Sequence, residues 1–181
     1  MSNIQAISFF DGRGYQRQQV VHNLRIDFAD SLSAERPDPQ LIASGVTVRS
    51  ASELDHEWIA GEVERTWKPE WLAEVKVALS KAKRRLSNPT AGAHFAIAND
   101  MCVAFAAWGV SRPHELGPAG TTPDFRRRGL GEALLWSCME DQRGLGLTYG
   151  EIKWAGPMSW FVRRFNARFS SAYLTYSKRV P

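Results

Sequence analysis

One stretch of the chain combines clustered arginines with closely spaced glycines, where a strand is expected to end and a helix to begin. It reads TTPDFRRRGLGEALL from residue 121 to residue 135. Glycine removes the side chain where a backbone must bend or be approached closely. The first amides of a helix lack partners within the helix, and its dipole adds partial positive charge there. These features predict a pyrophosphate site formed around Arg126, Arg127, Arg128, Gly129 and Gly131.

Two common phosphate-binding loops do not fit this stretch. A Walker loop needs Lys and then Ser or Thr after its last glycine, but Gly131 is followed by Glu132. A dinucleotide-binding loop needs a third glycine where this chain has Leu134. The alternative without a ligand is that the glycines only allow tight packing of strand and helix, with the arginines in solvent.

The elements expected around this loop are six strands and four helices, in the order β-α-α-β-β-β-α-β-α-β. Hydrophobic residues recur at every second position in strands and at three- to four-residue spacing in helices. This order predicts a mixed α/β fold around one sheet. The expected strands span residues 45–49, 94–98, 102–110, 115–121, 149–154 and 172–180. The expected helices span residues 54–67, 71–86, 130–143 and 159–169.

The motif Arg126-x-x-Gly129-x-Gly131, between a strand and a helix, resembles the acyl-CoA motif of the GNAT (Gcn5-related N-acetyltransferase) superfamily. The order of elements over residues 45–178 is similar to that family too. The resemblance implies a mostly antiparallel sheet with helices on both faces. It also implies acetyl-CoA or another acyl-CoA as co-substrate, with the pantetheine arm along the strand before the motif and the pyrophosphate on the loop. The implied CoA-binding residues are Ala119, Gly120, Thr121, Arg126, Arg127, Arg128, Gly129, Leu130, Gly131 and Glu132.

The resemblance also suggests a general base. In histone-type members a glutamate lies eleven residues before the Arg of the motif, which is Glu115 here. Glu115 would take a proton from the attacking amine, directly or through a water. The alternative is a solvated glutamate at the end of a strand, with the neighbouring His114 as a reserve candidate. The family's tyrosine acid maps to Phe161, so no acid is assigned, although a thiol with a pKa of roughly 8.5 can leave as thiolate.

The acceptor is expected to be the amine of a small molecule. Three of the chain's tryptophans, Trp58, Trp67 and Trp71, fall near the connection between the first two helices, where the family places acceptor specificity. With Glu62, Glu64 and Glu70 nearby they would suit a cationic or aromatic amine. The alternative is that these tryptophans belong to the helix core.

Other functions fit parts of the sequence. After Glu151 every charged residue is basic, which would suit an acidic acyl carrier protein that delivers the acyl group on phosphopantetheine. A catalytically silent GNAT fold that binds CoA or a partner protein is a second alternative. Nucleic acid is not expected as a partner, because the basic residues are not interleaved with aromatic ones in a recognisable pattern.

The first 35 residues are expected to be an appendage, joined by a linker over residues 36–44 to an acyltransferase domain over residues 45–181. Phe9, Phe10, Gly14 and Tyr15, followed by an apolar strand, resemble the closing helix, turn and strand of another GNAT domain. We therefore expect a remnant of a tandem acetyltransferase. Its strand, residues 18–28, would pair with the main sheet or form a homodimer with a partner chain.

Composition sets limits on these functions. The chain has 181 residues and a net charge of +4, and 44% of its residues are hydrophobic, enough for one cored domain. No apolar run approaches the length of a membrane span, and the first residues do not resemble a signal peptide. The two cysteines, Cys102 and Cys138, are expected to be reduced core thiols, so we expect a cytoplasmic protein. The four histidines lack ligand spacing, and no metal is expected.

Overall fold

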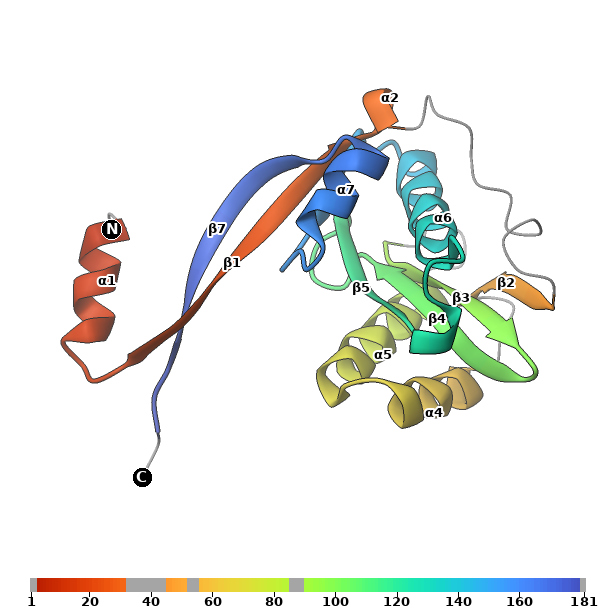
Figure 1. The fold of residues 1–181 in the computed structure, drawn as a ribbon, viewed down its shortest axis with the longest axis horizontal. Coiled ribbons are helices and arrows are strands. Elements are labelled where there is room, and N and C mark those ends of the chain that lie inside the picture. Colours follow the sequence, from red (N-terminus) through yellow and green to blue (C-terminus); the bar gives the residue numbers. More distant parts are fainter. Residues whose placement is uncertain (1–2, 32–44, 52–55, 85–89, 180–181) are drawn as a thin grey trace.

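The computed structural model describes residues 3–31, 45–51, 56–84 and 90–179, so the expected linker lies outside the described residues. A seven-stranded sheet has the order β2-β3-β4-β5-β6-β1-β7 (Figure 1). Neighbouring strands are antiparallel except β5 and β6, which are parallel. The expected α/β fold with a mostly antiparallel sheet is confirmed. The elements are α1 (Asn3–Asp11), β1 (Gln16–Asp27), α2 (Phe28–Ser31), β2 (Val46–Ser50), α4 (His56–Thr66), α5 (Pro69–Arg84), β3 (Gly92–Ala98), β4 (Met101–Trp108), β5 (Glu115–Thr121), η2 (Pro123–Phe125), α6 (Leu130–Gly144), β6 (Tyr149–Ile152), α7 (Met158–Phe165) and β7 (Arg168–Ser177).

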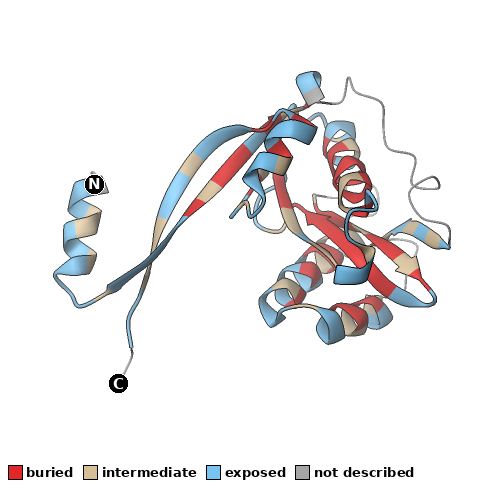
Figure 2. Ribbon diagram, viewed as in Figure 1, coloured by how far each residue is buried: buried red, intermediate tan, exposed pale blue. Residues whose placement is uncertain are grey.

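Helices cover both faces of the sheet, as expected. Helices α4 and α5 lie on one face, where the helical spacing of their apolar residues directs Ile59, Val63 and Val75 into the core. Helices α6 and α7 lie on the other face, where Leu134 and Phe165 are almost fully buried. Figure 2 shows the buried residues concentrated between these helices and the sheet. Two apolar layers therefore fix the position of β5, the strand that precedes the arginine-glycine motif.

The N-terminal strand β1 lies inside this sheet, between β6 and β7. It pairs with β6 from Leu24 to Asp27, and Leu24 and Ile26 are 3% and 0% exposed. The expected helix, turn and strand at the N-terminus are therefore present, and the strand pairs with the main sheet, which is the first of the two expected pairings. The strand begins at Gln16, two residues before the expected start.

The last helix and strand differ from expectation. The predicted helix continued to Phe169 and the predicted strand began at Ala172, but α7 ends at Phe165 and β7 begins at Arg168. The cause is Asn166, whose left-handed backbone (φ 50°) ends the helix. Phe169 continues the helical spacing of aromatic residues, which misled the prediction. In the structure it pairs with Leu24 of β1.

Both cysteines are buried and free, as expected. Burial raises the pKa of the Cys102 thiol to about 12 and raises that of Cys138 as well. The two thiols therefore stay neutral and serve as small apolar core groups. In the described part of the chain, no helix is both long enough and apolar enough to cross a membrane.

Candidate functional site

Strands β5 and β6 separate soon after they pair. Their parallel register holds only at Glu115 and Leu116, opposite Glu151 and Ile152. On its other side β5 carries a bulge, because it advances three residues, from Leu116 to Ala119, where β4 advances two. A bulge bends a strand and changes its direction. The last three residues of β5 therefore continue beyond the point where β6 diverges.

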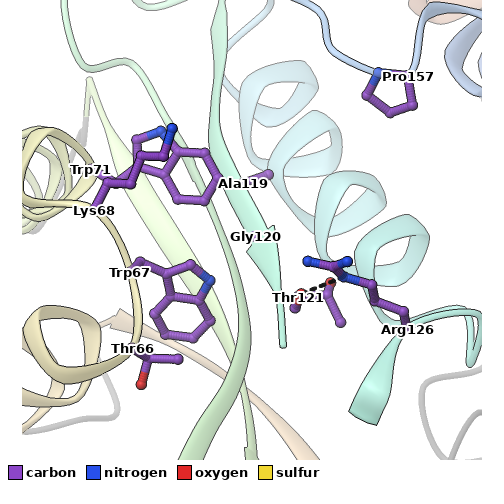
Figure 3. Close-up of a pocket in the computed structure, with 9 residues that line it drawn as sticks. All are labelled: Thr66, Trp67, Lys68, Trp71, Ala119, Gly120, Thr121, Arg126 and Pro157. Carbon is purple, nitrogen blue, oxygen red and sulfur yellow. Dashed lines mark hydrogen bonds between the residues drawn. The ribbon is translucent and has the colours of Figure 1, made fainter. Parts of the chain in front are cut away.

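A cavity of about 620 Å³ lies beside these last residues of β5. Figure 3 shows Trp67 and Trp71 on one side of the strand, with Arg126 and Pro157 on the other. The volume is within the usual range for a site that binds a small organic molecule. The lining residues are Thr66, Trp67, Lys68, Trp71, Ala119, Gly120, Thr121, Arg126 and Pro157.

Gly120 allows the tryptophan side of this cavity to approach the strand. A Cβ atom at Gly120 would lie 2.6 Å from Nε1 of Trp67 and 2.9 Å from Cζ3 of Trp71, too close for a real side chain. Both indoles also pack edge-on against Phe105, with ring centroids 4.9 and 5.9 Å away. Of the three tryptophans named from the sequence, these two line the cavity. Trp58 is not among the lining residues.

The arginine-glycine loop connects the end of β5 to the start of α6. Nε of Arg126 donates a hydrogen bond to the Thr121 carbonyl at 3.1 Å (Figure 3). Arg127 and Gly129 both have left-handed backbones, with φ of 58° and 77°. Because the Ala133 amide donates to the Gly129 carbonyl, the three amides before Ala133 are the first of the helix and have no acceptor within it. Left-handed residues next to free amides form the concave backbone arrangement that binds anions.

The charges around this loop are more strongly paired than the sequence indicates. Glu132, in the first turn of α6, would repel a phosphate, but Arg164 of α7 binds its carboxylate through Nη2 at 2.6 Å and Nε at 2.9 Å. The guanidinium of Arg128 lies over the Phe125 ring, 4.8 Å from its centroid. Arg164 therefore neutralises the acidic side chain closest to the helix start. Sequence reasoning missed this role, because the two residues are 32 positions apart.

The candidate base Glu115 is buried at the point where β5 and β6 separate, and it is only 4% exposed. Its Oε1 forms an ion pair with Nζ of Lys153 at 2.6 Å, and its Oε2 accepts a hydrogen bond from the Ser111 amide at 3.0 Å. Burial by itself would raise the pKa of Glu115, but the Lys153 and Ser111 contacts outweigh burial and lower it. The carboxylate is thus ionised near neutral pH. The alternative of a solvated glutamate at the end of a strand is therefore wrong, because the side chain is buried.

Glu115 does not line the cavity. It lies four residues before Ala119, and the bulge in β5 separates the two residues. His114, the reserve candidate, points to another neighbourhood, with its ring 5.0 Å from that of Tyr149 and 4.0 Å from the Glu151 carboxylate.

A second carboxylate, Glu74 of α5, faces the same charges. Burial raises the pKa of Glu74, the negative charge of Glu115 raises it further and the positive charge of Lys153 lowers it. Glu74 was not named from the sequence, although it follows Trp71 by three residues and so shares its helix face. Glu62, which the sequence suggested for the acceptor site, accepts a hydrogen bond from the Cys102 amide and is 4% exposed. Its carboxylate is therefore buried within the fold.

The N-terminal strand supports the loop that carries Lys153. The next residue, Trp154, has a left-handed backbone (φ 51°), unusual for a tryptophan, and its side chain is 62% exposed. Its amide donates to Oδ1 of the buried Asn23 at 3.2 Å, and the Ala155 amide donates to the His22 carbonyl at 2.8 Å. Strand β1 therefore holds this loop beside Glu115. The sequence offered no signal for this contact, since Asn23 reads as one polar residue in an apolar strand.

Phe161, at the position where the family would place an acid, is 7% exposed. Its ring packs against those of Trp160 and Phe165, with centroids 4.8 and 6.5 Å away. The side chain therefore belongs to the core beneath α7, and it has no proton to donate.

No protein-family profile and no curated protein matches this sequence, but solved structures do. A fungal GCN5-related glucosamine N-acetyltransferase region, within a multi-domain β-N-acetylglucosaminidase, is 14% identical over 96% of this chain and 22% of that chain (TM-score 0.72). A GCN5-related N-acetyltransferase from Kribbella flavida is 20% identical over 94% of this chain and 62% of that chain (TM-score 0.59). A tandem GNAT protein from the clavulanic acid biosynthesis pathway is 12% identical over 97% of this chain and 58% of that chain (TM-score 0.65). This chain thus spans less than two thirds of each, and it has the fold of the GCN5-related N-acetyltransferases.

Proposed function

We propose that this protein is an N-acyltransferase that moves an acetyl or other acyl group from acyl-CoA to the amine of a small molecule. The observation that carries the proposal is the continuity between two features. The cavity along the last residues of β5 leads to Arg126, where the loop presents the first amides of α6. One elongated ligand with an anionic end fits both features.

The donor end of the proposed site is the segment from Ala119 to Glu132. The pantetheine arm would lie along Ala119, Gly120 and Thr121, against the two indoles that line the cavity. The pyrophosphate would lie at the amides that begin α6, where the helix dipole and unpaired N–H groups favour negative charge. Arg164 supports this assignment, because it neutralises the Glu132 carboxylate beside those amides.

The acceptor end is the cluster of Glu115, Lys153 and Glu74, with the loop residue Trp154. Glu115 is ionised, so it can accept a proton from an ammonium substrate. Because Glu115 is not among the lining residues, the amine and the thioester would lie between the lining and Glu115, where one water could carry the proton to the carboxylate. The neutral amine nitrogen then attacks the thioester carbonyl carbon, the C–S bond breaks and CoA leaves as a thiolate. The nitrogen loses its extra proton to solvent, and the thiolate takes up a proton from solvent.

The acyl carrier protein is less favoured as donor than free acyl-CoA. Its docking was inferred from the basic C-terminal residues, but three of these are paired within the chain. Lys153 forms an ion pair with Glu115. Arg164 binds Glu132, and Arg168 forms an ion pair with Asp30 at 3.1 Å. Less positive charge is therefore available to an acidic carrier than the sequence suggests.

The test is thermal unfolding with acetyl-CoA, CoA and desulfo-CoA, on the wild type and on Gly129→Glu. A ligand present at 100 times its Kd stabilises the folded state by about 2.7 kcal/mol. We expect all three compounds to raise the Tm of the wild type, and Gly129→Glu to abolish the shift, because it places a carboxylate at the start of α6. No shift with the wild type at millimolar CoA would overturn the proposal.

Gly146→Glu is the matched control. Gly146 also has a left-handed backbone (φ 81°) and open space around it, but it follows the C-terminal end of the same helix. Both variants therefore add the same charge and similar backbone strain. Gly146→Glu should lower the Tm of the free protein and keep the CoA-induced shift. Loss of the shift in both variants would mean that strain, and not the phosphate site, is responsible.

A further inference from the structure

The N-terminal helix and the outer part of the β1–β7 ribbon project away from the rest of the fold (Figure 1). We define the arm as α1 with the outer ribbon, residues 16–20 of β1 and 173–177 of β7, and the body as strands β2 to β6 with helices α4 to α7. All of residues 16–20 are exposed, and burial begins at Val21. Strand β6 reaches β1 only from Leu24 onward. The arm is therefore a two-stranded ribbon that extends past the rest of the sheet.

Helix α1 is too short and too apolar to stand in water by itself. It has nine residues, NIQAISFFD, and isolated helices shorter than about 12 residues are marginal in water. The Phe10 ring stacks on Tyr176 of β7, with centroids 4.8 Å apart, and Asp11 forms an ion pair with Arg17. Ile4 and Phe9 nevertheless remain 76% and 43% exposed. One side of the helix is thus packed, and apolar groups on another side face solvent.

Helix α1 and strand β1 repeat the arrangement of helix α7 and strand β7. Helix α1 leads through a left-handed Gly14 (φ 74°) into β1, just as α7 leads through the left-handed Asn166 into β7. In the body, α7 buries Phe161 and Phe165 against the sheet. The Phe9 ring packs edge-on against Phe10, with centroids 5.4 Å apart, and the Arg13 guanidinium lies 3.8 Å from its centroid. Among the residues that the structure describes, however, no sheet covers Ile4 and Phe9 in the way that the body sheet covers Phe161 and Phe165. The repeated unit therefore predicts a second body that covers the arm.

The structural comparison indicates what that second body is. The match to the tandem GNAT protein covers 97% of this chain, so it includes the arm. This chain nevertheless spans only 58% of the length of that protein. The rest of that protein has room for another body. We propose that a second copy of this chain covers the arm, in a two-fold symmetric dimer in which each arm packs on its partner. Two-fold dimers are the commonest protein assemblies. The proposed dimer would bury the exposed apolar side chains of both arms.

Analytical ultracentrifugation of the full chain over a range of micromolar concentrations tests this proposal. The wild type should sediment with twice the mass of one 20.3 kDa chain. The double variant Ile4→Glu with Phe9→Glu should sediment as a single chain, because it places two charges in the interface. The matched control is Val77→Glu with Met101→Glu, two side chains of the body that are 41% and 53% exposed, and it should remain a dimer. A wild type of single-chain mass at every concentration would overturn the proposal, as would a dimer that survives the arm variant.

Hydrogen exchange of the wild type gives a second readout that needs no variant. The amides of α1 should exchange more slowly as the protein concentration rises, whereas those of α6 in the body should not change. Equal exchange of α1 at low and high concentration would contradict the dimer. Neither measurement uses CoA, so the proposed dimer and the proposed acyl transfer are tested independently. Either proposal can be wrong while the other holds.

Discussion

The donor end and the acceptor end of the proposed site are built in different ways. The donor end consists mainly of the backbone of one continuous segment, from Ala119 to Glu132. The acceptor end consists of side chains from four separate elements: β5, the loop after β6, helix α5 and the N-terminal strand, through Glu115, Lys153, Glu74 and Asn23. A site made of backbone leaves a local pattern in the sequence, with closely spaced glycines where a strand gives way to a helix. A site assembled from distant side chains leaves no local pattern.

The largest expected effect is at the acceptor end. Glu115→Gln should lower the rate of acyl transfer at neutral pH by about 10²- to 10⁴-fold, because it removes the general base. The measurement is the release of CoA thiol with a panel of small amines, and the CoA-induced Tm shift should be unchanged. Glu151→Gln is the matched control, since it alters the paired position on β6. An unchanged rate in Glu115→Gln would move the chemistry away from this end.

Gly120→Ala should have the next largest effect, at the donor end. The added Cβ would force Trp67 and Trp71 away from β5. Overpacking of this kind destabilises a fold by about 1–3 kcal/mol. We expect a lower Tm by differential scanning calorimetry and a weaker CoA-induced shift, because the displaced indoles line the cavity. If the Tm falls and the CoA shift keeps its full size, the tryptophan wall does not contact the ligand.

The sequence was sufficient for much of the donor end and little of the acceptor end. The arginine-glycine loop, the strand before it and the helix after it lie where expected, because each depends on neighbouring residues. The ion pair between Glu115 and Lys153 depends on how two strands diverge, and the support from Asn23 depends on a strand inserted from the N-terminus. The end of α7 was misplaced because Asn166 changed the backbone without changing the spacing of aromatic residues. Glu74 could have been found, since it shares a helix face with Trp71.

Gly131→Ala separates a ligand site from tight packing. An alanine Cβ at this position would lie 3.6 Å from Oγ1 of Thr121, an ordinary contact, so the fold accommodates it. Alanine within a helix is favoured over glycine by about 0.5–1 kcal/mol, so the free protein should unfold at a slightly higher temperature. CoA should bind about tenfold more weakly, which is about 1.4 kcal/mol, because a methyl group now lies where the phosphate approaches. Equal affinity of wild type and variant would favour the packing explanation.

The last prediction concerns the pH dependence of the acceptor end, where the effect is smallest but the sign is specific. In the wild type the pKa of Glu115 is lowered despite its burial, because of Lys153 and the Ser111 amide. Its carboxylate therefore contributes stability above the ordinary glutamate pKa of 4.5, and that contribution is lost as the pH falls through the lowered pKa. Lys153→Met removes the largest of the interactions that oppose burial, so we expect the pKa of Glu115 to rise above its ordinary value. The folded state then favours the protonated acid, so this group's contribution is lost as the pH rises instead.

Two measurements check this reversal. In urea unfolding across acidic pH, the contribution of Glu115 to the free energy of unfolding should rise with pH in the wild type and fall with pH in Lys153→Met. The acid limb of the pH–rate profile should move to higher pH in the variant. Lys153→Arg is the control, because it keeps the positive charge and should follow the wild type. Superimposed profiles for all three proteins would mean that Lys153 does not hold Glu115 ionised. The acceptor end would then depend on the backbone contact with Ser111, and the difference in construction between the two ends would be smaller than the side-chain geometry indicates.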